Sequence, residues 1–373
     1  MLNLTQLLSC RNAGYLRYKR RNSPVIVWNI TRACNLDCSF CYYDADKNPS
    51  GKDYLDFKLA KHIIEQLRQA QIKFVLLSGG EPLLYPEIFN LLKKLTSFSI
   101  QVGISTNGTL INKTLAQDLK RSGARYVGIS LDGAKGTHNT LRNSPTAFDQ
   151  ALIGLRYAQD SGLKTGIRLT LNTNNYTRIR EFFSFVEGLN VDRLCFYHLV
   201  YSGRAKTSND LTRAKRKKTI ELLIDLTMGW VKRKIATEVL SVDNFSDGAI
   251  LLDYLRRKRF KNYSSVLGLL KKQGGCPAGR GILSIDHLGV LHPCQFWTVH
   301  NLADLKKDNL LDFLNNGNPF KQWRVKLKGR CSLCDFKEIC AGCRLRAFQA
   351  YADYWQEDPA CCLEAVPPTS PTA

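Results

Sequence analysis

The segment Pro24-Val-Ile-Val-Trp-Asn-Ile-Thr31, followed by Cys34-Asn-Leu-Asp-Cys38-Ser-Phe-Cys41, decides which fold this sequence can build. The first part is an apolar run of strand length and predicts a buried β-strand. The second part places three cysteines on the loop that follows the strand. Three thiolates on one loop can bind three irons of a cubane cluster, which leaves the fourth iron open to an outside ligand. A zinc site with a distant fourth ligand is the alternative reading of this spacing.

Strand and helix patterns alternate after this segment. Strands are predicted at 24–31, 74–77, 100–105, 126–131, 164–171 and 193–200. Helices are predicted at 55–70, 88–95, 112–122, 146–160 and 177–188, with a long helical stretch to about 235. Six β-then-α units predict an α/β fold, a parallel sheet that curls into a partial (β/α)6 TIM barrel with its helices outside. An open Rossmann-type sheet is the alternative, but no Gly-x-Gly-x-x-Gly follows the first strand.

The chain of 373 residues is long enough for one large and one small domain. We expect a polar, basic lead-in at 1–22, the barrel at 23–235 and a basic connector at 236–275. A small cysteine-rich domain is expected at 276–366. The proline-containing tail at 367–373 is expected to be disordered.

Composition narrows the setting in which the protein works. The chain carries 13 cysteines and a formal net charge of +22. No secretory signal opens it, and no apolar run reaches the ~20 residues that span a bilayer. We therefore expect a cytoplasmic, non-membrane protein whose clustered cysteines bind metal. The positive charge indicates either a solvated basic surface or an acidic partner, and the absence of an RNA-recognition motif disfavours nucleic acid.

Polar and glycine-rich segments follow the next three predicted strands. They are Ser78-Gly-Gly-Glu81-Pro82, Ser105-Thr-Asn107-Gly108 and Ser130-Leu-Asp132-Gly133, the last followed by His138 and Arg142. In a parallel barrel these positions gather at the carboxyl ends of the strands, where active sites lie. Together with the cysteine loop, the segments resemble the radical S-adenosylmethionine (SAM) superfamily.

The resemblance implies a role for each of these residues. Cys34, Cys38 and Cys41 would hold a [4Fe–4S] cluster whose free iron binds the amino and carboxylate groups of SAM. One electron would then cleave SAM, and the 5′-deoxyadenosyl radical would take hydrogen from the substrate. The implied SAM-binding residues are Phe40 near the adenine, Gly79, Gly80 and Glu81 at the amino group, Ser105 and Asn107 at the ribose, Ser130, Asp132, and Arg142 at the carboxylate. Asn139 stands where His-Asp-x-x-Arg of related enzymes has an acid, which puts the local pairing in doubt.

A second group of cysteines begins at Cys276. A zinc ribbon is the alternative reading, but zinc needs four ligands and this group is larger. The arrangement resembles the SPASM domain, which implies two auxiliary [4Fe–4S] clusters. The implied ligands are Cys276, Cys294 and Cys343 for the first cluster, and Cys331, Cys334, Cys340 and Cys361 for the second. The fourth ligand of the first cluster stays open between water, substrate and a residue such as Cys362. Cys10 and Cys195 are expected to be free thiols.

The resemblance covers 25–363 and points to tetrapyrrole-modifying members of the subgroup. Val27-Trp-Asn-Ile-Thr31, Phe196-Tyr-His-Leu-Val-Tyr-Ser-Gly-Arg204 and His292-Pro-Cys-Gln-Phe-Trp297 are similar to the heme d1 biosynthesis protein and the siroheme-pathway deacetylase. Gly275-Cys-Pro-Ala-Gly279 and Cys340-Ala-Gly-Cys-Arg-Leu-Arg-Ala347 are similar to the heme synthase that decarboxylates Fe-coproporphyrin. The chain mixes features of these enzymes, so the resemblance does not fix one reaction.

These relatives imply an anionic substrate, a tetrapyrrole that loses a propionate- or acetate-derived group, and an electron donor such as ferredoxin or flavodoxin. The candidate substrate residues are Tyr197, His198 and Arg204, since an arginine can bind a carboxylate bidentately. A core histidine and a surface ion pair are the plain alternatives for His198 and Arg204.

Two other functions remain open. One is a maturase of a ribosomal peptide, although its usual N-terminal recognition domain would not fit in 22 residues. The other is a non-catalytic Fe–S or zinc protein that binds RNA, which would not cleave SAM.

Overall fold

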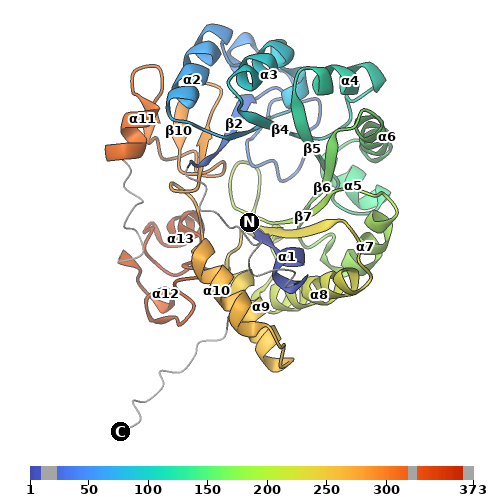
Figure 1. Cartoon of the computed structure of the whole chain (residues 1–373), viewed down its shortest axis with the longest axis vertical. Helices are drawn as coiled ribbons and strands as arrows, with labels where there is room; N and C mark the ends of the chain where they lie inside the picture. The colour runs from blue at the N-terminus through green and yellow to red at the C-terminus, as the bar shows by residue number, and fades with distance from the viewer. Residues whose placement is uncertain (10–22, 318–325, 364–373) are drawn as a thin grey trace.

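The computed structural model describes residues 1–9, 23–317 and 326–363. Six parallel strands pair in chain order and curve into a partial barrel (Figure 1). They are β2 (Val25–Thr31), β3 (Phe74–Gly79), β4 (Gln101–Thr106), β5 (Ala124–Ser130), β6 (Lys164–Leu171) and β7 (Arg193–His198). The order contains no reversal, which an open doubly wound sheet requires. The predicted partial (β/α)6 barrel is confirmed.

Helices cover the convex face of this sheet (Figure 1). They are α2 (Phe57–Gln69), α3 (Ile88–Ser97), α4 (Lys113–Arg121), α6 (Ala147–Asp160), α7 (Ile179–Glu187) and α8 (Arg213–Lys232). Each was expected from its apolar spacing. One more helix, α5 (Lys135–Arg142), lies between β5 and α6 and was not expected. It is a short helix of mostly polar residues, and its start lacks a strong sequence signal because Ala134 is its N-cap.

The sheet continues past the sixth strand. β8 (Glu238–Val242) pairs in parallel with β7, and β1 (Leu2–Asn3) pairs antiparallel with β8. α1 (Leu4–Ser9), α9 (Ser246–Arg257) and α10 (Tyr263–Gln273) pack beside them. Residues 236–275, expected as a connector, thus contain a strand of the main sheet and two helices. Their basic residues misled the prediction because Arg256 and Arg257 stand in the last turn of α9, where cations favour the helix dipole.

The lead-in expected at 1–22 is only partly described. Its first nine residues form β1 and α1, with Leu4, Leu7 and Leu8 buried. Residues 10–22, which include Cys10, lie outside the described residues, as does the tail at 367–373.

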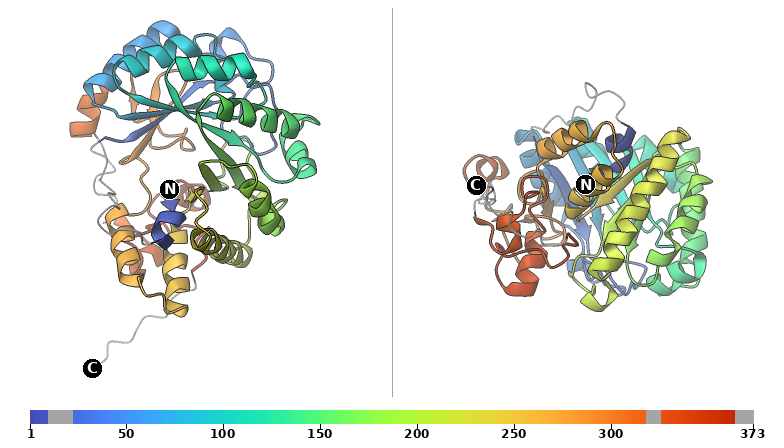
Figure 2. Two further views of the ribbon diagram at one scale, coloured as in Figure 1. Left: turned by 45° about the vertical axis from the view of Figure 1, so that its right-hand side comes forward. Right: turned by 90° about the horizontal axis from the view of Figure 1, so that it is seen from below.

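The C-terminal segment joins the opposite edge of the same sheet. β9 (Ile282–Ile285) pairs in parallel with β2, and β10 (Val290–His292) and β11 (Ala303–Asp304) follow in antiparallel register. Three short helices come next, namely α11 (Leu310–Asp312), α12 (Arg330–Leu333) and α13 (Arg344–Tyr351). In Figure 2 these orange and red elements lie at one side of the barrel.

Short helical turns lie within the loops. The 3-10 turns are Gly51–Asp53, Pro82–Leu84, Tyr176–Arg178 and Thr207–Asn209, and a π-helical turn spans Phe313–Gly317. In the described residues no helix is both long and apolar enough to pass through a bilayer.

The strands of the barrel have two distinct faces. In β6 the side chains of Ile167, Leu169 and Leu171 are buried in the main hydrophobic core. Arg168 and Thr170 alternate with them and line a cavity on the concave side. The core therefore lies between sheet and helices, and the concave side is left for polar groups.

Candidate active site at the carboxyl ends of the strands

One cavity brings together segments that are far apart in the sequence. Its lining comes from the loop after β2, from the ends of β3 to β7, from α5 and from the segment after β10. The predicted site residues on its wall are Cys34, Cys38, Phe40, Cys41, Gly79, Gly80, Ser105, Asn107, Ser130, Arg142, Tyr197, His198 and Arg204. Two predicted SAM ligands, Glu81 and Asp132, are fully buried and do not line the cavity.

The cysteine loop is held from outside by the segment that follows β7. Arg204 donates from Nε to the Cys38 carbonyl at 3.0 Å and from Nη1 to the Ala45 carbonyl at 2.9 Å. Its own N–H donates to the Cys41 carbonyl at 2.8 Å. A Cβ at Gly203 would stand 2.3 Å from the same Cys41 oxygen. Arg204 thus positions the loop, and its predicted contact with the substrate stays a prediction.

The three thiols of this loop fit an iron–sulfur cluster by their chemistry. Burial raises the pKa of Cys34 to about 12 and also raises the pKa of Cys38. A bound metal offsets this effect because it binds the thiolate. Among the described residues, no group of three His, Cys, Asp or Glu side chains is placed to hold a single ion. In a cubane each thiolate binds a different iron, so its ligands stand farther apart than those of one ion.

The glycine-rich segment after β3 lies against the cysteine loop. A Cβ at Gly79 would stand 2.3 Å from the Thr31 carbonyl oxygen, and one at Gly80 would stand 2.2 Å from the Ala33 carbonyl oxygen. The N–H of Gly80 donates to Thr31 at 2.7 Å. Glycine is required here because two backbones meet, in addition to any approach of a ligand.

Glu81 ties this segment to the end of β4. Its carboxylate accepts from the Thr106 hydroxyl at 2.7 Å and from the Asn107 N–H at 2.8 Å. Burial raises the pKa of Glu81 to about 7. The Glu81 carboxylate is therefore hydrogen-bonded to Thr106 and Asn107, and both of these residues line the cavity.

Arg142 joins the cysteine loop to the end of β5. It forms an ion pair with Asp132 and donates from Nη1 to the Cys38 sulfur at 3.4 Å. Its guanidinium lies 5.4 Å from the centre of the Phe40 ring. His138 accepts from the Asp132 N–H at 3.1 Å, and burial lowers the pKa of His138 to about 4. Asn139 stands at the position where related enzymes have an acid, and its side-chain oxygen accepts from the Phe148 N–H in the first turn of α6 at 2.9 Å.

On β7, His198 is held by a buried acidic network. His198 Nε2 lies 2.7 Å from Asp247 Oδ2, and Asn244 donates to the other oxygen of Asp247 at 2.9 Å. Asp247 is on α9, in the segment that the sequence suggested was a connector. A carboxylate that fixes one ring nitrogen of a histidine orients the other.

Sequence reasoning also missed Arg168 on β6. Its guanidinium lies over the Tyr197 ring, 4.6 Å from the ring centre, and it lines the cavity. The available signal was an arginine that alternates with isoleucine and leucine inside a strand pattern.

The C-terminal cysteines fall into two neighbourhoods. Cys276, Cys294 and Cys343 pack in one cluster with Trp297, and the pKa of Cys294 is raised by burial and then by repulsion from Cys343 and Cys276. In the second neighbourhood, burial raises the pKa of Cys340, and Cys361 and Cys331 add to the effect. Its members are Cys331, Cys334, Cys340 and Cys361. This grouping matches the predicted ligand sets, while ligation itself stays a prediction.

The remaining described cysteines are buried. Cys362 packs in the main core, and burial raises its pKa to about 12. It was considered as a further ligand of the first auxiliary cluster, but it does not pack with Cys276, Cys294 or Cys343. Cys195 lies in β7 as a buried free thiol.

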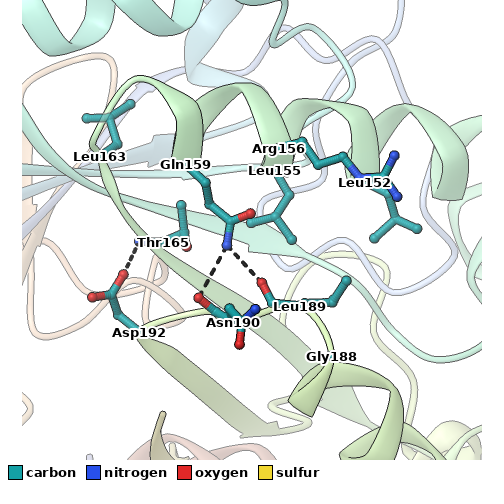
Figure 3. A pocket seen from close by; sticks show the side chains of 10 residues that line it. All are labelled: Leu152, Leu155, Arg156, Gln159, Leu163, Thr165, Gly188, Leu189, Asn190 and Asp192. Atoms are coloured by element: carbon teal, nitrogen blue, oxygen red, sulfur yellow. Dashed lines mark hydrogen bonds between the residues drawn. The ribbon is translucent and has the colours of Figure 1, made fainter. Parts of the chain in front are cut away.

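A second hollow lies between α6 and the turn before β7 (Figure 3). Gln159 donates to the Leu189 carbonyl at 2.8 Å, and Asp192 accepts from the Thr165 N–H at 2.7 Å. These polar groups bind one another, at the end of β6 remote from the cysteine loop. The hollow is therefore structural.

The comparisons agree with this geometry. Residues 28–186 match the radical SAM superfamily. The chain is 34% identical over 362 residues to an Fe-coproporphyrin III synthase of Methanosarcina barkeri, covering 93% of this chain and 90% of that protein. The chain therefore belongs to the radical SAM superfamily, whose members use a [4Fe–4S] cluster and SAM.

One further sequence relative and one solved structure are similar to the chain over most of its length. The pre-heme d1 synthase of Dinoroseobacter shibae is 31% identical, with 92% of this chain and 87% of that protein covered. The structure of Streptococcus suis SuiB bound to its precursor peptide superposes with a TM-score of 0.72 at 20% identity, over 91% of this chain and 76% of that one. The resemblance to SPASM-type enzymes is confirmed at the level of fold.

Proposed function

We propose that this chain removes or shortens carboxylate side chains of a tetrapyrrole by SAM-dependent radical chemistry. The observation that carries the proposal is the shared cavity, whose wall combines the three loop cysteines, the SAM-binding segments and cationic side chains. The relatives named for Fe-coproporphyrin III and pre-heme d1 support a tetrapyrrole as the substrate. A polycarboxylate substrate also suits a protein with a net charge of +22.

The residues that line the cavity would have different roles in binding the cluster and SAM. A [4Fe–4S] cluster bound at Cys34, Cys38 and Cys41 would supply the electron that cleaves SAM. Arg142, beside Cys38, would bind the SAM carboxylate, because a guanidinium fork matches its geometry. Asn107 and the glycine segment would place the rest of SAM against the cysteine loop.

His198 is the side chain best placed to serve the substrate. Asp247 holds one of its ring nitrogens, and the residue lines the cavity. We propose that His198 orients a substrate carboxylate or carries a proton to it. Tyr197, its neighbour on β7, would form part of the same wall.

The C-terminal cysteines would hold two auxiliary [4Fe–4S] clusters. The proposed ligands are Cys276, Cys294 and Cys343 for one, and Cys331, Cys334, Cys340 and Cys361 for the other. These sites would pass or accept an electron or anchor the substrate. We infer a reducing, cytoplasmic setting, because cysteines that bind clusters have to stay reduced. We also infer an electron donor such as ferredoxin or flavodoxin, because the proposed cleavage of SAM consumes one electron.

The test is anaerobic reconstitution with dithionite, SAM and a series of siroheme and porphyrin derivatives. We expect 5′-deoxyadenosine and a mass loss in one tetrapyrrole. We also expect about twelve irons per chain, which fall by about four in a variant with alanine at Cys34, Cys38 and Cys41. Deoxyadenosine with every tetrapyrrole unchanged would instead favour a peptide substrate. No deoxyadenosine under any condition would refute radical SAM chemistry in this chain.

A further inference from the structure

The cavity contains a cation that the proposed function has not yet used. Three arginines line it, namely Arg142, Arg168 and Arg204. Arg142 is paired with Asp132, and Arg204 is bonded to the cysteine loop. Arg168 lies on β6, flanked in the sheet by Ser130 on β5 and Cys195 on β7.

The groups around Arg168 are mostly phenols and a thiol. Its charge is felt mainly by Tyr197, Tyr126 and Cys195. Burial raises the pKa of Cys195 to about 11 and also raises the pKa of Tyr197. Within 1–9, 23–317 and 326–363, no carboxylate forms an ion pair with Arg168, although Asp243 feels its charge.

The fold makes room for this side chain. Arg168 crosses over Gly128 of β5, where an added Cβ would stand 2.8 Å from Arg168 Cδ. The guanidinium is then seated on the Tyr197 ring, 4.6 Å from its centre. A guanidinium that has lost much of its water and forms no ion pair is stabilised by an anion that binds it.

The geometry points to Arg168 as the binding site of a substrate carboxylate inside the cavity. This inference rests on the proposed function. The SAM carboxylate has its own partner in Arg142, which contacts Cys38 of the cysteine loop. Arg168 instead lies over Tyr197 on β7, so a carboxylate bound to it would stand beside that candidate substrate residue. Arg168 would thus select a tetrapyrrole side chain that ends in a carboxylate and fix its position.

The experiment measures binding to the reconstituted holoenzyme. Coproporphyrin III and its fully esterified form are titrated by quenching of protein fluorescence, and SAM is titrated separately. We expect Arg168→Gln to weaken coproporphyrin III binding roughly 10- to 150-fold, the range for hydrogen bonds to a charged group, and to leave SAM binding unchanged. The ester should bind both proteins equally. Arg168→Lys, which keeps the charge but loses the fork, should fall between them.

The matched control is Arg156→Gln, which removes an exposed arginine of α6 at the other hollow and should change neither affinity. Wild-type porphyrin affinity in Arg168→Gln would overturn the inference. A selective loss of SAM affinity would also overturn it and would assign the carboxylate to SAM. If the wild-type enzyme cleaves SAM but binds no tetrapyrrole, the proposed function fails first and the inference fails with it.

Discussion

Replacement of Arg346 by glutamine tests which contacts stabilise the packing of the C-terminal domain against the barrel. Arg346 lies on α13 and is fully buried. It donates to both carboxylate oxygens of Asp358, at 3.0 and 2.9 Å, and to the Asp243 carbonyl and the Asn244 side chain, each at 3.1 Å. One guanidinium therefore links the cysteine-rich segment to the turn between β8 and α9.

The size of the expected stability loss depends on the hydrogen bonds that Asp358 retains in Arg346→Gln. Removal of one member of a buried ion pair costs about 3–5 kcal/mol, because the other charge stays buried without compensation. Asp358 still accepts the N–H groups of Cys343 and Ala360, at 2.7 and 3.0 Å. We therefore expect the lower end, a loss of about 3 kcal/mol in the free energy of unfolding.

The assay is urea unfolding of the reconstituted protein at pH 7. The control is Arg257→Gln, whose half-exposed ion pairs with Glu221 and Asp253 should each be worth about 1 kcal/mol or less. If the two variants differ by less than about 1 kcal/mol, the buried pair does not fasten the domain as described.

The same pair predicts an acid limit to stability. Burial opposes ionisation of Asp358, but Arg346 and the hydrogen bonds outweigh it, so the pKa falls from 3.8 to about 2. A lowered carboxyl pKa stabilises the fold above its unfolded value, so this contribution is complete above about pH 4 and is lost as the pH falls towards 2. The loss should be smaller in Arg346→Gln.

Three further changes separate the roles of residues around the cavity. Arg204→Gln should speed iron loss to a chelator and leave tetrapyrrole affinity unchanged, because Arg204 holds the cysteine loop. Weaker tetrapyrrole binding with unchanged iron loss would instead identify Arg204 as a substrate ligand. Burial raises the pKa of Glu81 from 4.5 to about 7, so the stability that its protonated form gives the fold is complete below pH 4.5 and is lost as the pH rises through 7. In Glu81→Gln the melting temperature of the SAM-free chain should therefore depend less on pH between 4.5 and 7. Asp247→Asn should reduce product formation about tenfold or more, since His198 loses its orientation, and SAM cleavage without substrate should not change.

The barrel was predictable because its signals are local. Each strand from β2 to β7 is an apolar run, and the helices between them show helical spacing. The ends of these strands carry the cysteine loop and the polar segments, so most of the cavity wall could be predicted once the strands were placed in parallel.

The missed features depend on contacts that no local pattern reveals. β8 is recognised as a sheet strand only through its pairing with β7. The structural contacts of Glu81 and Arg204 could not be predicted for the same reason, since both side chains bind backbone or hydroxyl groups brought near by folding. Arg168 is a different case. Its alternation with Ile167 and Leu169 is visible in the sequence, and only the groups that surround its guanidinium had to be found from the structure.

The pairing of β9 with β2 has a consequence for electron flow. Backbone hydrogen bonds join the strand that leads into the cysteine loop to a strand that lies between Cys276 and Cys294. The proposed cluster site that includes Cys276 and Cys294 is thus joined to the cysteine loop by one continuous sheet, which sets the separation between the two sites. Electron tunnelling depends steeply on distance, so transfer between these sites should proceed at the same rate in viscous and in dilute solution.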